Sequence, residues 1–223
     1  MTRKKSQLLP VNPETLKNKE FKFKLTLSEE QKKVKADAYL YDVNVVLGNY
    51  ASGKTVTSCA IALDMLFKKQ VTKIYISRPI DFKATGFLQG SVKEKLYFHT
   101  LPVFQNFYSL YDKAAIDKLH EEGVIEIIPI DYMKGMNFTP KSITIIDEFE
   151  DITYKEFELI LSRLCKEAKL FFVGSEQQID IKNSCICKIK KLKDSGLVGY
   201  NVLTSNHRNE KIFEILDYLK ENV

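Results

Sequence analysis

The chain has 223 residues, of which 44% are hydrophobic and 28% charged, and its net charge is +5. This length suits one medium domain, and the apolar content excludes a disordered chain. No run of about 18 apolar residues occurs, which excludes a membrane-spanning helix and argues against a membrane partner. The whole net charge falls in the first 27 residues, which hold seven basic and two acidic side chains.

Residues 1–25 are predicted to form a basic N-terminal arm, and residues 26–223 a single domain. The arm contains Pro10, Pro13 and many lysines, and it has no helical periodicity. Because no apolar stretch follows the basic start, the arm is not expected to be a secretory signal. The four cysteines are too scattered for a metal site and fit reduced thiols. We therefore expect a cytoplasmic protein, in the host cytoplasm if the source is a virus.

Beyond the arm, helices and strands are predicted to alternate along the chain. The first helix is expected over 29–40 with Ser28 as its N-cap, and a short apolar strand follows at 43–47. Helices are then expected at 55–68, within 91–120, at 154–165 and at 210–220, and strands at 73–77, 124–129, 142–146, 170–173 and 199–203. Several of these strands are apolar throughout, which is typical of a parallel sheet covered on both faces. The predicted fold class is α/β.

A glycine-rich loop lies between the first predicted strand and the helix after it, and it matches G-x-x-x-x-G-K-[ST] completely. The glycines allow the backbone to approach phosphates, and N–H groups at the helix start supply positive potential. The lysine can reach the β- and γ-phosphates, and the threonine hydroxyl can ligate Mg²⁺. The sequence therefore predicts a nucleotide-phosphate site made of Gly48, Asn49, Tyr50, Ala51, Ser52, Gly53, Lys54 and Thr55.

Acidic side chains follow the buried strand at 142–146. At this position Asp147 is expected to bind Mg²⁺, and Glu148 to orient and deprotonate an attacking water. The acidic pair favours water as the acceptor, and hence hydrolysis. Glu150 and Asp151 are expected to form a solvated acidic turn at the start of the next helix, because helix starts favour acids.

Other polar side chains are predicted near the phosphates. Gln178 follows the strand at 170–173 and would face the γ-phosphate, because ligands bind at the carboxyl ends of parallel strands. Arg78 follows the strand at 73–77 and is a candidate phosphate or transition-state contact, although structural ion pairs are a common alternative. For Arg163 the structural alternative, pairing with an acid such as Glu158, is favoured.

Residues 182–193 hold five lysines and no acid. Such a stretch can bind a phosphate backbone in a salt-dependent way. A solvated amphipathic helix with Ile186, Ile189 and Leu192 facing inward explains the same residues. The aromatic cluster within 98–111 is expected to be core rather than a base-stacking surface.

Together these segments resemble the PhoH family, ATP-binding proteins with a core similar to the first motor domain of superfamily one helicases. The matching segments are GNYASGKT (48–55), SRP (77–79), GFLQGSVKEK (86–95), YMKGMNF (132–138), IIDE (145–148), GSEQQID (174–180) and NHR (206–208). The resemblance covers about residues 25–220 and implies a RecA-like P-loop NTPase with a mostly parallel sheet. The chain departs from the family at Ser175, where an aspartate is usual, and at Met136, where an arginine is usual.

The resemblance implies hydrolysis of ATP with Mg²⁺, coupled to RNA or single-stranded DNA. In superfamily one helicases a glutamine placed like Gln31 contacts adenine; here Ser28 and Gln31 also form a capping-box pattern, and both roles can hold. Helicases of this kind place ATP between two motor domains, and this chain has the length of one. We therefore expect a homo-oligomer such as a hexameric ring, in which Arg208 or Arg163 reaches the adjacent site.

Two other functions remain open from the sequence. One is a nucleotide-gated binding module with little turnover, which the departures at Ser175 and Met136 favour. The other is a small-molecule phosphotransferase, against which the pair Asp147–Glu148 and Gln178 argue.

Overall fold

The computed structural model describes residues 25–79, 92–176, 181, 183–205 and 218. At its centre lies a six-stranded sheet, parallel throughout, with the strand order β3-β2-β4-β5-β1-β6. The strands are β1 (Val43–Gly48), β2 (Lys73–Ser77), β3 (Ile125–Ile127), β4 (Ser142–Asp147), β5 (Lys169–Gly174) and β6 (Gly199–Leu203). The predicted parallel sheet is confirmed.

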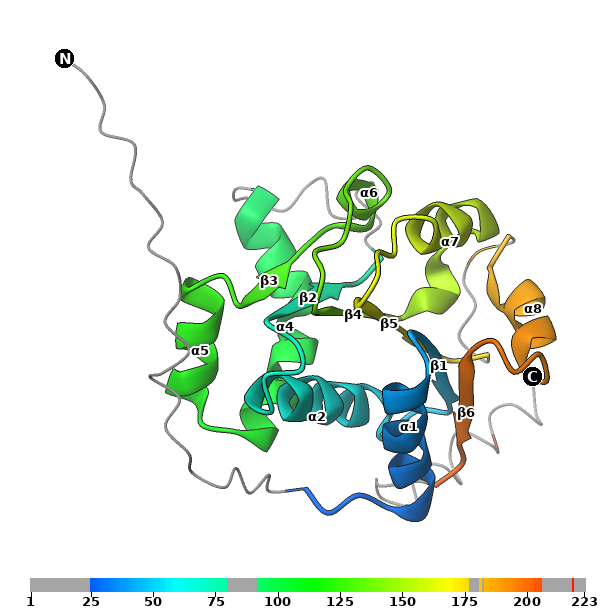
Figure 1. The fold of residues 1–223 in the computed structure, drawn as a ribbon, viewed down its shortest axis with the longest axis horizontal. Helices are drawn as coiled ribbons and strands as arrows, with labels where there is room; N and C mark the ends of the chain where they lie inside the picture. The colour runs from blue at the N-terminus through cyan, green and yellow to red at the C-terminus, as the bar shows by residue number, and fades with distance from the viewer. Residues whose placement is uncertain (1–24, 80–91, 177–180, 182, 206–217, 219–223) are drawn as a thin grey trace.

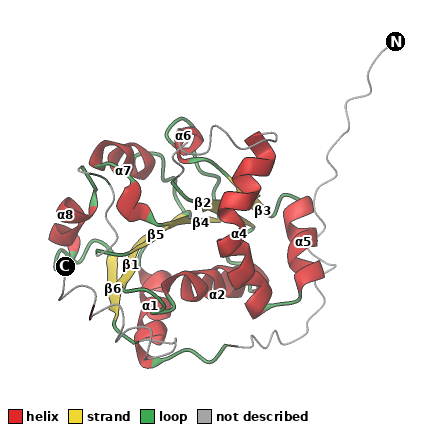
Figure 2. Ribbon diagram, turned by 180° about the vertical axis from the view of Figure 1, so that it is seen from behind, coloured by secondary structure: helices red, strands yellow, loops and turns green. Residues whose placement is uncertain are grey.

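Helices cover both faces of this sheet (Figures 1 and 2). One face packs against α1 (Glu29–Leu40), α2 (Lys54–Phe67), α4 (Val92–Leu110) and α5 (Lys113–Glu121). The other packs against α6 (Ile130–Met133), α7 (Tyr154–Leu161) and α8 (Ile186–Ile189). Two short 3₁₀ turns, η2 (Phe149–Asp151) and η3 (Lys190–Leu192), follow β4 and α8. In the part of the chain that is described, no helix is both long and apolar enough to cross a bilayer.

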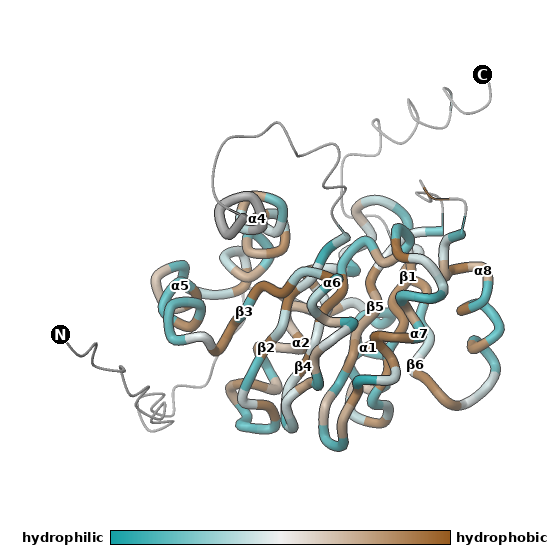
Figure 3. Tube along the Cα trace, turned by 90° about the horizontal axis from the view of Figure 1, so that it is seen from above, coloured by the Kyte–Doolittle hydropathy of each residue, from teal (hydrophilic) through white to brown (hydrophobic). Residues whose placement is uncertain are grey.

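The two faces arise from the alternation of side chains along each strand. In β1, Val46 packs into the cluster under α2, while Val45 and Leu47 pack under the opposite helices. In β5, Phe171 and Phe172 divide in the same way. Because both faces are buried, the strands are continuous runs of apolar residues. In Figure 3 the residues along the strands are mostly hydrophobic, and those in the turns around the sheet are mostly hydrophilic.

The predicted elements agree closely with the observed ones. The first helix and the strands at 73–77 and 199–203 have the predicted bounds, and the helical stretch within 91–120 divides into α4 and α5. The helix predicted at 154–165 ends earlier, at Leu161, because Arg163 and Leu164 donate to carbonyls three residues back and so form tight turns. The helix predicted at 210–220 falls almost wholly outside the described residues.

The strand order decides where the functional side chains meet. Because all six strands run in one direction, their carboxyl ends lie at one edge of the sheet, where ligands of α/β proteins bind. β5 separates β1 from β4, so the loop after β1 and the acids after β4 are two strands apart. One strand between these two is the arrangement expected from the resemblance to RecA-like P-loop NTPases.

Helix α1 is fastened to the last strand of the sheet. The Asn201 side chain donates to Asp37 at 2.8 Å. Nearer the start of α1, the Glu30 carboxylate accepts hydrogen bonds from the backbone and hydroxyl groups of Thr204 and Ser205. These bonds hold the pKa of Glu30 at about 2, well below its usual value. The first helix and the final strand therefore form one unit beside β1.

Candidate functional site

The loop after β1 has the backbone of a phosphate cradle. A Cβ on Gly48 would overlap Ser52 Oγ and lie 2.7 Å from the Leu203 carbonyl, so only glycine fits there. Gly53 has φ +81° and caps α2 without a side-chain hydrogen bond. The first N–H groups of α2 are thus left without a capping side chain, as an anion site at a helix start requires.

Thr55 joins this loop to the end of β4. Its hydroxyl donates to Asp147 Oδ1 at 2.8 Å, across 92 residues of sequence. Lys54 Nζ lies 3.2 Å from the Asn49 carbonyl, within its own loop. Asp147 is 7% exposed, and its burial raises its pKa while the bond from Thr55 opposes that rise. Thr55 and Asp147, each predicted to bind Mg²⁺, are therefore in direct contact.

Thr55 and Asp147 form a donor set that fits Mg²⁺. Both ligand atoms are hard oxygens, and Mg²⁺ in nucleotide sites commonly takes one or two protein ligands together with phosphate oxygens and water. Asp147 and its neighbourhood offer one buried carboxylate and one hydroxyl, which is the small protein share that such an ion uses. The residues present therefore fit the metal that the sequence predicts.

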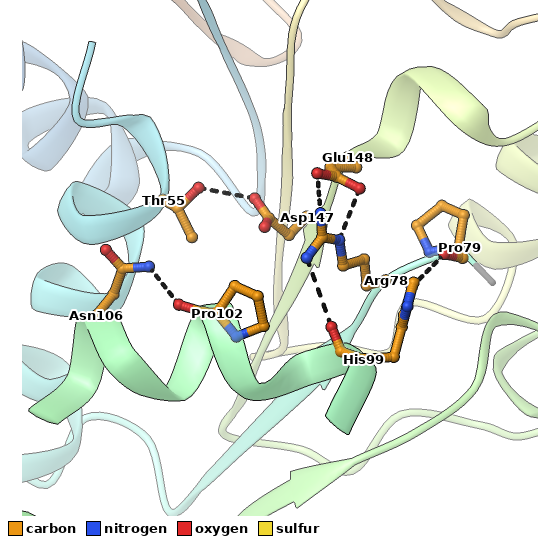
Figure 4. A network of polar contacts seen from close by, with 8 residues as sticks. All are labelled: Thr55, Arg78, Pro79, His99, Pro102, Asn106, Asp147 and Glu148. Atoms are coloured by element: carbon orange, nitrogen blue, oxygen red, sulfur yellow. Dashed lines mark hydrogen bonds and ion pairs between the residues drawn. The ribbon is translucent and has the colours of Figure 1, made fainter. Parts of the chain in front are cut away.

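Glu148 has a strained backbone and a fixed side chain. Its φ of +54° lies in the left-handed region, which is uncommon for a residue with a Cβ. Arg78 Nε donates to Glu148 Oε2 at 2.6 Å, and Arg78 Nη2 donates to Oε1 (Figure 4). Arg78 Nη1 lies 3.5 Å from the carbonyl of His99 on α4, and His99 Nε2 lies 2.7 Å from the carbonyl of Pro79. The two candidates Arg78 and Glu148 thus meet as an ion pair.

Glu150 corrects one prediction, because it is not a solvated residue. It is 1% exposed, and burial raises its pKa to about 7. The backbone amide of Ser175 hydrogen-bonds to its carboxylate, whereas Oε2 has no hydrogen-bond partner. Gly174 makes room for it, since a methyl group there would overlap Glu150 Oε2 and lie 2.7 Å from a ring atom of Phe149.

The 3₁₀ turn η2 explains why Glu150 points inward. Glu150 is the middle residue of this turn, Phe149–Asp151, and its carboxylate lies against Gly174 at the end of β5. The sequence shows four acids within 147–151 without showing the turn that sorts them. A candidate side chain was missed for that reason. Asp151, in contrast, is partly exposed, as expected for a turn at a helix start.

Gln31 has the predicted capping-box role. Its Oε1 accepts from the Ser28 N–H at 3.0 Å, and its own N–H donates to Ser28 Oγ at 3.3 Å. Gln31 lies in α1 and is buried, and its contact with adenine stays a prediction. Gln178 and Arg208 lie outside the described residues. Arg163 donates to the Lys134 carbonyl at 3.2 Å, a structural contact to a partner other than the expected Glu158.

A small pocket lies next to Arg78. Its accessible volume is about 100 Å³, and it lies between the end of β2, the start of α6, the end of η2 and α7. Arg78 lines it together with three carboxylates, Asp131, Asp151 and Glu156. Lys134 forms ion pairs with Asp131 at 2.5 Å and with Glu156 at 3.1 Å. The pocket wall therefore carries more negative than positive charge.

The basic stretch 182–193 is packed on its apolar side. Ile186 and Ile189 are buried and Leu192 is partly buried, as the amphipathic alternative predicted. Lys188 Nζ lies 3.5 Å from the centre of the Tyr154 ring, and Lys190 pairs with Glu176 at 2.7 Å. In the aromatic cluster, Phe104 and Phe107 are fully buried, as predicted, and Phe98 is exposed.

The sequence of this chain is similar to those of known proteins. The family model described as PhoH-like protein matches residues 25–217. A PhoH-like protein of Mycobacterium bovis is 33% identical over 187 residues, covering 79% of this chain and 53% of the relative. A PhoH-like protein of Bacillus subtilis is 28% identical over 185 residues, covering 79% and 58%. The chain spans about half the length of these curated relatives.

Among solved structures, the UvsW helicase from bacteriophage T4 is similar to this chain with a TM-score of 0.48 and 14% sequence identity. The match covers 81% of this chain and 61% of that chain.

Proposed function

The chain belongs to the PhoH-like family, and from that premise we propose that it binds ATP and hydrolyses it with Mg²⁺. The observation that carries the proposal is the 2.8 Å contact between Thr55 and Asp147, because it joins the phosphate loop to the acidic end of β4. A loop that matched the motif by chance would have no reason to meet an acid 92 residues away. The oxygen donors and the uncapped start of α2 support the same function.

The residues divide the chemistry among themselves. The loop N–H groups and Lys54 bind the phosphates, while Thr55 and Asp147 would hold Mg²⁺. When bound, Mg²⁺ neutralises charge on the β- and γ-phosphate oxygens. Glu148 takes a proton from water as the water oxygen bonds to the γ-phosphorus and the bond to the bridging oxygen breaks. Gln178 would position that water, and Gln31 would contact adenine.

Phosphate release from ATP and Mg²⁺ tests this function. We expect Glu148→Gln to lower kcat by about 10²-fold to 10⁴-fold, the usual contribution of a general base, without changing nucleotide affinity. Glu121→Gln, an exposed substitution in α5, is the matched control and should leave kcat unchanged. Equal rates in the wild type and Glu148→Gln would show that the proposed hydrolysis is wrong.

Coupling to nucleic acid and self-association extend the proposal. We propose that RNA or single-stranded DNA binds through local basic segments, the arm at 1–25 and the stretch at 182–193, because each holds an excess of basic side chains while the charges beyond the arm sum to zero. Stimulation of phosphate release by a single strand should then fade as salt rises.

We further propose a homo-oligomer in which Arg208 of one copy reaches the site of the next. Light scattering with ATP and Mg²⁺ should show assembly, and a fully active monomer would contradict it.

A second function, nucleotide-gated binding with little turnover, is favoured by one observation. Both oxygens of the proposed base Glu148 are engaged by Arg78. A protein that stayed in this state would bind ATP and release little phosphate. The Glu148→Gln comparison separates the two functions, because a binding module would show equally slow release in both forms.

A further inference from the structure

The Arg78–Glu148 pair is a bidentate ion pair at the carboxyl edge of the sheet. Two guanidinium nitrogens donate to the two carboxylate oxygens, and the third lies near the His99 carbonyl. Charge-assisted bidentate contacts of this kind fix geometry as well as adding energy. The side chain of Arg78 is 17% exposed and that of Glu148 is 41% exposed, so the pair lies at the margin of the site.

The pair aims Glu148 away from the phosphate loop. In the sheet, β4 lies between β2, which carries Arg78, and β5, beyond which β1 leads into the loop. Figure 4 shows the same separation, with Thr55 on one side of Asp147 and the Arg78–Glu148 pair on the other. A general base must reach the water whose proton it takes. Glu148 therefore has to leave Arg78 before it can act on a water near the phosphates.

The neighbouring pocket offers Arg78 another position. Arg78 already lines this pocket of about 100 Å³, across from Asp131, Asp151 and Glu156. Asp131 and Glu156 share the single charge of Lys134, so these three side chains have a net negative charge that a guanidinium can balance. If Arg78 turned into the pocket, it would exchange one carboxylate partner for others at little electrostatic cost.

We propose that Arg78 is a latch with two positions, one on Glu148 that blocks the base and one in the acidic pocket that releases it. This inference rests on the proposed function, because it assigns a regulation to the same hydrolytic site. Arg78 is a positioning residue, since it acts through Glu148. The two positions form a two-state equilibrium, and the fraction of molecules with Arg78 in the pocket sets the basal rate.

Substitution of Arg78 tests the latch directly. Arg78→Gln removes the bidentate contact, and we expect kcat for phosphate release to rise roughly threefold to thirtyfold while KM for ATP stays unchanged. Arg78→Lys keeps the charge but cannot bridge both oxygens, so it should raise kcat by a smaller factor. A kcat at or below the wild-type value in Arg78→Gln overturns the latch, because Arg78 would then assist catalysis.

The pocket is tested by a second variant and by the pair of variants together. Asp131→Asn, an exposed substitution in the first turn of α6, should lower kcat roughly twofold to fivefold by weakening the released position. The same substitution should have no effect in the Arg78→Gln background, where no latch remains. Asp117→Asn, which removes a similar lysine-paired acid in α5, is the matched control. An equal loss in both backgrounds, or no loss in the wild type, overturns the pocket position.

The Glu148→Gln variant separates failure of the latch from failure of the function. If the wild type is faster than Glu148→Gln while Arg78→Gln is not faster than the wild type, hydrolysis stands and the latch is wrong. If the wild type and Glu148→Gln release phosphate equally slowly and Arg78→Gln is no faster, both are wrong.

Discussion

The phosphate loop and the acidic turn after β4 lie at the same edge of the sheet but hold their groups by different means. The loop relies on backbone: a close approach at Gly48, a positive φ at Gly53 and the uncapped start of α2. The acidic turn relies on contacts from other elements, since the Thr55 and Arg78 side chains bind Asp147 and Glu148, and the Ser175 backbone amide binds Glu150. The first region is a local structure, whereas the second depends on residues from β2, α2 and β5.

This difference teaches how the two regions should respond to change. Loss of one cationic side chain in the loop removes a contact to ligand and leaves the backbone cradle intact. A change in the acidic turn disturbs buried charge and packing, so its effect should appear in the stability of the fold and in its pH dependence. Variants of the loop should therefore change activity, and variants of the acidic turn should change the stability of the fold.

The largest effect is expected at Lys54. Lys54→Ala should lower kcat/KM for ATP by about 10²-fold to 10³-fold, because it removes a charge placed for the phosphates. The free energy of unfolding should change little. Phosphate release and urea unfolding of the same sample measure both quantities. Lys33→Ala, at an exposed site in α1, is the control, and equal activity of the two variants would contradict the role of the loop.

The next effect is expected at Glu150 and depends on pH. The folded-state pKa of about 7 lies above the ordinary 4.5, so the folded chain holds a proton that the unfolded chain releases. The stability contributed by protonated Glu150 is therefore lost as the pH rises from about 4.5 through 7. At pH 8 the free energy of unfolding of Glu150→Gln should exceed that of the wild type by up to about 3 kcal/mol. At pH 4.5 the two free energies of unfolding should be close.

Urea unfolding at the two pH values measures this difference. Asp147 has its pKa raised in the same direction, so part of the pH dependence should remain in the variant. Glu121→Gln serves as the exposed control, with an expected change within about 0.5 kcal/mol. A variant that is less stable than the wild type at pH 8 would show that the Glu150 charge is stabilised by groups around it.

Substitution of Gly174 should lower the free energy of unfolding by a smaller amount. Gly174→Ala places a methyl group against Glu150 and the buried ring of Phe149, and such overpacking typically costs about 1–3 kcal/mol. Gly135→Ala is the matched control, because the nearest atom to its added Cβ is a carbonyl oxygen at an ordinary 3.7 Å. Thermal or urea unfolding would compare them, and a Gly174→Ala chain as stable as the control would mean that the acidic turn is more adaptable than its packing indicates.

The smallest effect is expected at Glu30, where the pKa is shifted the opposite way. Its folded-state pKa of about 2 lies below the ordinary 4.5, so the stability it contributes is present above 4.5 and is lost as the pH falls through 2. Because Glu30 is only partly buried and solvent screens its charge, Glu30→Gln should cost less than about 1 kcal/mol at pH 7. The difference should shrink toward pH 2 in unfolding measurements, and a difference that grew there would contradict the sign.

The sequence predicted the loop because its chemistry is local. The spacing of residues from Gly48 to Thr55 by itself predicts a phosphate-binding loop. The bounds of strands and helices follow from apolar runs and from capping residues such as Ser28. Glu150 could not be placed in this way, because its burial depends on a 3₁₀ turn and on the absence of a side chain at Gly174. The pairing of Arg78 with Glu148 was likewise hidden, since it depends on β2 lying beside β4, which no single segment shows.

The position of β1 has a consequence for synthesis on the ribosome. Its two neighbours in the sheet, β5 and β6, follow all the other described strands in the chain, so the strand leading into the phosphate loop has no partner in this sheet until Lys169 and the residues after it have emerged. At ordinary rates of translation the 121 residues from Gly48 to Lys169 take roughly 6 to 24 seconds. A nascent chain should therefore gain its affinity for nucleotide only after β5 and β6 have emerged.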